Sequence, residues 1–161
     1  MKTMNRRHLL AAAAASVIAR PAFAEPAPLV EVWKSPTCGC CGDWIKHLQA
    51  SGFRTKVIDA GNTAARARAG IADKYGSCHT AFVEGYAIEG HVPAADIRRL
   101  LAERPRAIGL AVPGMPVGSP GMEGGRPEVY EGVLFGDSAP VGFGRFIGDP
   151  KKVISMVSIR D

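Results

Sequence analysis

The sequence lacks any apolar run long enough to cross a membrane. Its most apolar stretch, residues 9–19, is well short of the ~20 residues that a bilayer requires. Beyond this stretch there is no basic patch interleaved with aromatic residues and no basic amphipathic helix, so the sequence indicates neither nucleic-acid binding nor stable membrane insertion. No internal repeat is visible. We therefore expect a single domain.

The first 24 residues contain no acidic residue. They form a basic head, an apolar stretch and a final Ala22-Phe23-Ala24, the pattern of a bacterial export signal with its cleavage site. Arg6-Arg7 followed by His8 favours the twin-arginine type, although the usual Ser or Thr before the arginines is missing. Without the four basic residues of this segment, the remaining chain has a net charge of only +1. We expect a periplasmic protein, cleaved near Ala24, whose domain covers residues 25–161.

Cysteine is scarce, but its four residues are clustered. Cys38, Cys40 and Cys41 lie within four residues, and Cys78 stands in the segment Ser77-Cys78-His79-Thr80. Adjacent Cys40 and Cys41 would form only a strained disulfide, so the cluster cannot readily pair every sulfur within itself. A domain of about 137 residues can also bury a core without disulfides. A soft-metal site or a redox centre is therefore favoured over two structural disulfides.

Hydrophobic periodicity and turn residues predict the order of the elements. Strands are expected at 29–33, 55–58, 80–83 and 86–89, and helices at 41–50, from Asn62 or Thr63 to about Tyr75, and from Pro93 to about Pro105. The Gly/Pro/Met-rich loop 111–125 precedes strands at 129–135, 141–146 and 152–159. This order predicts a thioredoxin-like α/β fold, with a mixed sheet, flanking helices and a C-terminal β extension.

In a thioredoxin-like fold, the loop entering the third strand lies next to the start of the first helix. The fold therefore predicts that Cys78 lies beside Cys38, Cys40 and Cys41. The helix dipole should lower the pKa of the nearby thiols. Trp33 and Trp44 are expected to pack around the cluster, and His47 to face solvent on its helix.

Four clustered sulfurs favour copper over zinc. Thiolates and thioethers suit Cu(I), and closely spaced thiolates can bridge several ions, whereas structural zinc sites usually use two separated ligand pairs. His79 is expected either to bind the metal or to tune a bound thiolate. Met115 and Met122 stand in a loop with little core to fill, so they are either core residues or soft donors that contact or capture copper.

Four segments together resemble the CopG-type copper-resistance family of exported bacterial proteins, long labelled a domain of unknown function. The segments are Cys38-Gly39-Cys40-Cys41, Ser77-Cys78-His79-Thr80-Ala81, Gly90-His91-Val92-Pro93-Ala94, and the loop from Pro113-Gly114-Met115-Pro116 to Gly121-Met122-Glu123. The resemblance implies a thioredoxin-like domain that binds copper in the periplasm through its cysteines, with a multinuclear thiolate-bridged cluster and a role in copper redox conversion. It also implies a site role for His91.

Two functions are therefore in competition. The first is a periplasmic copper-binding protein that sequesters Cu(I), or cycles it between oxidation states, in copper resistance, with copper ions and other periplasmic copper-handling proteins as partners. Metal binding is favoured over enzyme activity, and an enzyme of this kind would be a copper or thiol oxidoreductase. The second is a thiol-disulfide oxidoreductase in which Cys38 and Cys41, spaced C-x-x-C, carry out the exchange and Cys40 or Cys78 is the resolving cysteine. The absence of a proline before the third strand argues against the second, because that proline shapes substrate docking in thioredoxins.

Overall fold

The computed structural model describes residues 26–136, 141–147 and 153–156, so the expected export signal lies outside the described residues. No helix in these ranges is long and apolar enough to span a membrane. The elements follow in the order β1 (Leu29–Lys34), α1 (Gly39–Ala50), β2 (Arg54–Ile58), α2 (Thr63–Arg68), a 3-10 helix (Asp73–Tyr75), β3 (His79–Val83), β4 (Tyr86–Glu89), α3 (Ala94–Glu103), β5 (Gly109–Ala111), β6 (Val129–Phe135), β7 (Val141–Ile147) and β8 (Val153–Met156).

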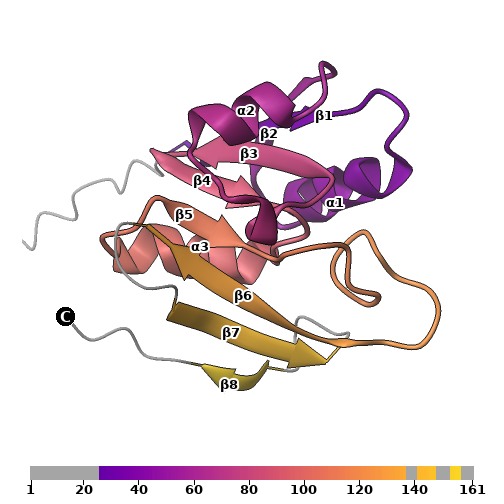
Figure 1. Cartoon of the computed structure of the whole chain (residues 1–161), viewed down its shortest axis with the longest axis vertical. Helices are drawn as coiled ribbons and strands as arrows, with labels where there is room; N and C mark the ends of the chain where they lie inside the picture. Colours follow the sequence, from indigo (N-terminus) through magenta and orange to yellow (C-terminus); the bar gives the residue numbers. More distant parts are fainter. Residues whose placement is uncertain (1–25, 137–140, 148–152, 157–161) are drawn as a thin grey trace, which may run out of the picture.

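All the strands join one mixed sheet in the order β2-β1-β3-β4-β5-β6-β7-β8 (Figure 1). β1 pairs parallel with β2 and antiparallel with β3, and β4 pairs antiparallel with β3 and parallel with β5. The remaining pairs are antiparallel. The predicted C-terminal extension of the sheet is therefore present. The end of its last predicted strand, residues 157–159, lies outside the described part of the chain.

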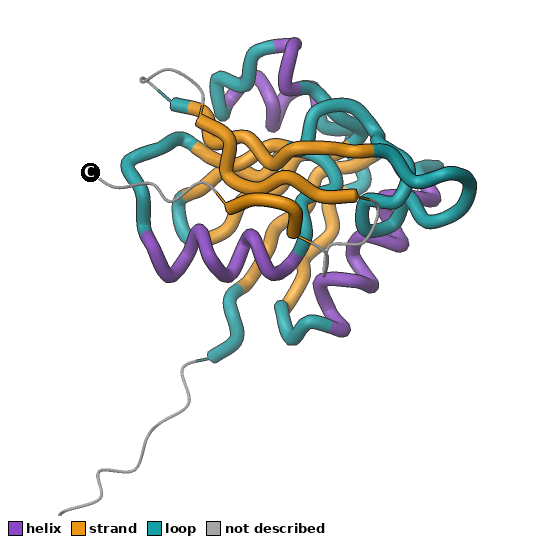
Figure 2. The backbone as a smooth tube through the Cα atoms, turned by 90° about the horizontal axis from the view of Figure 1, so that it is seen from below, coloured by secondary structure: helices purple, strands orange, loops and turns teal. Residues whose placement is uncertain are grey.

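Two helices cover one face of the sheet and one helix covers the other. Figure 2 shows α1 and α3 on the same side of the strands and α2 on the opposite side. The main core lies under α1 and α3, because their apolar stripes face the inward side chains of the strands. Its fully buried members include Val30, Val32, Trp44, Leu48, Ile88, Ile97, Leu100 and Leu110.

The hydrophobic core on the face under α2 is smaller, and a charged side chain packs against its aromatic rings. Trp33 lies on this face, edge-on to Phe82 at 5.1 Å, and the Arg68 guanidinium lies over both rings. Side chains alternate along β1, so Trp33 points away from the face that carries its neighbours Val32 and Lys34. The prediction that Trp33 packs around the cysteines is therefore wrong.

The second predicted helix is shorter than expected. α2 ends at Arg68, Gly70 has a φ of +64°, and a separate 3-10 helix covers Asp73–Tyr75. Glycine readily adopts this left-handed conformation, so Gly70 ends the helix before the predicted end near Tyr75. The Asn62 side chain does not cap α2 but donates to the carbonyl of Ser77 and to Thr80 Oγ1, both at 3.2 Å.

One strand was not predicted. β5 has only three residues, Gly109–Ala111, and its sequence merges into the glycine- and proline-rich loop that follows. The strand forms because β4 and β6 pair with it from both sides. A Cβ on Gly109 would lie 1.9 Å from the Ala87 carbonyl oxygen, so only glycine permits this approach.

Candidate metal centre

Three of the cysteines lie at the start of α1. Cys38 is the residue before the helix and its side chain makes no capping hydrogen bond, while Cys41 is fully buried in the first turn. Cys38 and Cys41 are three residues apart and therefore lie on the same side of the turn. Their Cα atoms are 5.4 Å apart, and the two sulfurs form a disulfide.

Cys78 meets this turn from the segment that enters β3. Its Sγ lies 3.8 Å from Cys40 Sγ and 3.5 Å from Cys41 Sγ, and the sulfurs of Cys38 and Cys40 are 3.5 Å apart. All four sulfurs lie within 4.8 Å of one another. The structure thus brings Cys78 to the other three cysteines, from which the sequence separates it by 37 residues or more.

The copper hypothesis requires four reduced cysteines, but two of them form a disulfide. Cys38 and Cys41 are paired, while Cys40 and Cys78 are free. Only a thiolate binds a metal strongly, so reduction of the pair is needed before all four sulfurs can act as donors. The structure therefore shows the oxidised form of this turn.

His91 contacts Cys78 from the turn after β4. Its ring is fully buried, Nε2 lies 3.1 Å from Cys78 Sγ, and Nδ1 lies 2.8 Å from the Pro120 carbonyl oxygen. A carbonyl only accepts hydrogen bonds, so Nδ1 carries the proton and Nε2 presents its lone pair to the sulfur. His91 therefore has the tautomer and orientation of a metal ligand.

His79 is a second histidine in contact with Cys78. Its Nδ1 is 3.4 Å from Cys78 Sγ, and the ring is fully buried between Trp44, at 4.3 Å, and His91, at 4.9 Å. Burial, and then the nearby His91, lower the pKa of His79 to about 3, so the ring is neutral at ordinary pH. Its Nε2 has no hydrogen-bond partner within the described part of the chain. The nitrogen that faces Cys78 is Nδ1, so a metal shared with Cys78 would be held by Nδ1.

The electrostatics of Cys78 differ from the prediction. Burial, followed by the charge of Cys40, raises the pKa of Cys78 to about 12, although the helix dipole was expected to lower the pKa of thiols here. Burial has a larger effect on this pKa than the helix dipole, because desolvation disfavours the thiolate. A cation bound between the sulfurs would reverse this balance, since it stabilises the thiolate directly.

The Cys78 segment is held by a buried polar network that sequence reasoning missed. The Glu89 carboxylate accepts hydrogen bonds from the Ser77 backbone N–H at 2.7 Å and from Thr80 Oγ1 at 2.5 Å. It also pairs with the Arg66 guanidinium at 2.8 Å, which in turn donates to the Ser77 carbonyl. Glu89 is fully buried. The available signal was a carboxylate at the end of an otherwise apolar strand, with an Arg-rich helix upstream.

The loop 111–125 lies over the start of α1. A Cβ on Gly121, whose φ is +82°, would lie 2.6 Å from the Trp44 backbone nitrogen and 2.7 Å from the Cys40 carbonyl oxygen. Met115 is 52% exposed and lines a pocket together with Cys78. Met122 is half-buried, and its backbone N–H donates to the Ser119 carbonyl.

His47 has a structural contact that contradicts its predicted solvent-facing position. It is half-buried, and its Nε2 accepts a hydrogen bond from the Ala94 backbone N–H at 3.0 Å. The start of a helix leaves its first N–H groups without intrahelical partners, and His47 satisfies one of them. The prediction for Trp44 is confirmed, because this ring packs on His79 and its Nε1 donates to the Val92 carbonyl at 2.8 Å.

The fold and site define a mixed α/β protein with two groups of thiols and imidazoles that could hold a metal ion. One group is Cys38, Cys40, Cys41 and Cys78, and the other is Cys78, His79 and His91. A family described as "Protein of unknown function, DUF411" matches residues 75–122. Two solved structures, forms 1 and 2 of "Copper resistance protein copG", are each 44% identical to this chain.

The structural likeness extends over most of the chain. Form 1 covers 76% of this chain and 98% of its own, with a TM-score of 0.71, and form 2 covers 74% and 98%, with a TM-score of 0.70. No curated protein matches. The chain belongs to the family of CopG copper resistance proteins, as the cysteine, histidine and loop motifs indicated.

Proposed function

We propose that the protein binds Cu(I) in the periplasm, through the thiolates of Cys38, Cys40, Cys41 and Cys78, as part of copper resistance. The observation that carries this proposal is the convergence of Cys78 with the start of α1, which gathers four sulfurs within 4.8 Å. Sulfur donors select Cu(I) over harder ions. The related structures are of a copper resistance protein, which supports the same metal.

The arrangement of donors favours more than one copper ion per chain. Cys78 belongs both to the four-sulfur group and to the group that it forms with His79 and His91. A thiolate shared by two donor groups can bridge two ions. The harder imidazole nitrogens accept Cu(II) as well as Cu(I), so this second group is where a change of copper oxidation state could be accommodated. The thioether of Met115, which lines a pocket together with Cys78, is a further soft donor for incoming copper.

The topology supports the thioredoxin-like assignment that we propose for residues 29–103. β1 and β2 are parallel and joined through α1, while β3 and β4 form an antiparallel hairpin followed by α3, as the predicted β-α-β-α-β-β-α order requires. The expected export signal supports a periplasmic location, with partners that supply or accept copper there.

Anaerobic titration of the reduced protein with Cu(I), in competition with a chromogenic chelator, tests the copper proposal. We expect more than one Cu(I) per chain, with loss of bound copper when Cys38, Cys41 or Cys78 is changed to serine. Elemental analysis of protein from copper-grown cells should show the same metal. No copper uptake by the fully reduced protein would refute the proposal.

A thiol-disulfide oxidoreductase is the second candidate, and the disulfide between Cys38 and Cys41 favours it. The pair is spaced C-x-x-C at a helix start, and Cys78 lies 3.5 Å from Cys41 Sγ, within reach for exchange. Reduction of insulin by the metal-free protein would support this candidate. If the activity is absent while copper binds, the oxidoreductase reading is rejected.

A further inference from the structure

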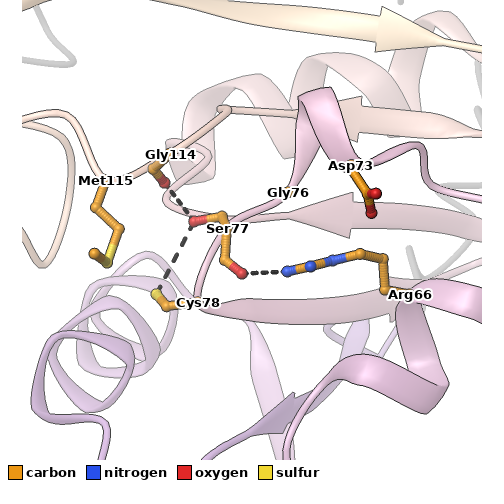
Figure 3. A pocket seen from close by; sticks show the side chains of 7 residues that line it. All are labelled: Arg66, Asp73, Gly76, Ser77, Cys78, Gly114 and Met115. Atoms are coloured by element: carbon orange, nitrogen blue, oxygen red, sulfur yellow. Dashed lines mark hydrogen bonds between the residues drawn. The ribbon is translucent and has the colours of Figure 1, made fainter.

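An open pocket of about 370 Å³ lies beside the metal centre, on the side of the segment that leads into β3. Figure 3 shows its wall, which includes Arg66, Asp73, Ser77, Cys78, Gly114 and Met115. Cys78 is the one residue that this wall shares with the two groups of thiols and imidazoles. The pocket therefore leads from solvent to the sulfur that both groups have in common.

The backbone holds Met115 next to Cys78. The N–H of Gly114 donates to the Gly76 carbonyl at 3.0 Å, and the Ser77 hydroxyl donates to the Gly114 carbonyl at 2.5 Å. The residue before Met115 is thus tied to the two residues before Cys78. Figure 3 shows both sulfur-bearing side chains pointing into the same space. Although the two residues are far apart in sequence, these hydrogen bonds fix their side chains on one wall.

Met115 is more exposed than a methionine of the core would be. With 52% of its surface exposed, it is among the large apolar side chains that the described structure leaves most open to solvent. A flexible thioether at the rim of a pocket is a soft donor available to an incoming ion. The charges of the wall do not oppose a cation, because Arg66 is paired with the buried Glu89 and Asp73 adds a carboxylate.

We propose that Met115 is a capture ligand, which binds Cu(I) at the pocket and passes it to Cys78. This inference rests on the proposed copper function. The transfer is a ligand exchange without electron transfer: the bond from copper to the Met115 thioether breaks, a bond to the Cys78 sulfur forms, and the thiol proton leaves to solvent. The exchange runs toward Cys78 because an anionic thiolate is a stronger donor for Cu(I) than a neutral thioether.

Stopped-flow measurement of Cu(I) uptake by the reduced, anaerobic protein tests this role. The probe is Cu(I) supplied as its acetonitrile complex. In Met115→Leu, which keeps the size but removes the donor, we expect the rate constant of uptake to fall about tenfold, at the low end of the range seen among variants of one site. The number of bound ions and the affinity measured by chelator competition should be unchanged. Met115→His should restore the rate, because imidazole also binds Cu(I).

The possible outcomes separate this inference from the function on which it rests. An unchanged uptake rate in Met115→Leu, with normal copper binding by the wild type, would overturn the capture role alone. Loss of a bound ion in Met115→Leu would also overturn it, because Met115 would then be a permanent ligand. Failure of the wild type to bind copper would overturn the proposed function itself. A slower rate that only Met115→His restores would support the capture role.

Discussion

Removing the Glu89 carboxylate should loosen the segment that carries Cys78. Glu89 is fully buried and accepts hydrogen bonds from the Ser77 N–H at 2.7 Å and Thr80 Oγ1 at 2.5 Å, besides its ion pair with Arg66 at 2.8 Å. The change Glu89→Ala leaves these donors without their acceptor. Most of the lost stability comes from the Ser77 N–H and the partly buried Arg66 guanidinium, which lose their acceptor.

The expected loss of stability follows from these contacts. Breaking a buried ion pair by removing one partner costs about 3–5 kcal/mol. Arg66 is 25% exposed, so water can solvate part of its charge after the change. Burial also raises the pKa of Glu89, which means that part of its desolvation cost is recovered when the carboxylate is removed. We therefore expect Glu89→Ala to lower the free energy of unfolding by about 3 kcal/mol, at the lower end of that range.

Urea denaturation of the metal-free protein measures this change. Glu31→Ala is the matched control, because Glu31 pairs with Lys56 at the same distance of 2.8 Å but at the surface, where such a pair contributes about 0–1 kcal/mol. Glu89→Gln keeps the shape and one acceptor, so it should lose less stability than Glu89→Ala. Weaker Cu(I) binding by Glu89→Ala should accompany the loss. If Glu89→Ala and Glu31→Ala prove equally stable, the network does not hold the segment and the reasoning is wrong.

Three further predictions concern stability, each measured by urea denaturation. Gly121→Ala should lower the free energy of unfolding by about 2 kcal/mol or more, because φ is +82° and the new Cβ would lie 2.6 Å from the backbone of α1. A stability equal to that of the wild type would mean that the loop does not pack against α1. His47→Leu should cost about 1 kcal/mol by leaving the Ala94 N–H at the start of α3 unsatisfied, and an unchanged midpoint would refute this capping role. Asp96→Asn should stabilise the protein at pH 8 but much less at pH 5. Burial raises the pKa of Asp96 from 3.8 to about 7, so the wild type loses stability as the pH rises through this window, by about 1–3 kcal/mol, and equal effects at both pH values would contradict the assignment.

The sequence was a good guide to elements with strong local signals. Short β-rich runs between turn residues predicted the bounds of Tyr86–Glu89 and Val129–Phe135 as observed, and Pro93 marked the start of α3. Elements whose signal is weak or depends on partners were misjudged. The helix from Thr63 stopped early because Gly70 adopts a left-handed conformation, and β5 exists only through the strands on either side of it.

The residues of the candidate site could be chosen from the sequence, but their contacts could not. Clustered Cys38, Cys40 and Cys41 are a local pattern, and the order of the elements was enough to predict that Cys78 joins them. The burial that raises the pKa of Cys78, by contrast, depends on side chains from several elements at once. The cap formed by His47 on α3 likewise joins two helices that are distant in sequence.

The sequence by itself therefore identified the candidate donors, since residue type alone makes sulfur and imidazole suitable for copper. Tertiary structure decided how these donors are presented. It paired Cys38 with Cys41, fixed the proton of His91 through the Pro120 carbonyl, and gave His79 Nε2 no partner among the described residues. The reason is physical: donor chemistry belongs to single side chains, whereas distance, desolvation and hydrogen bonding arise only when remote segments pack together.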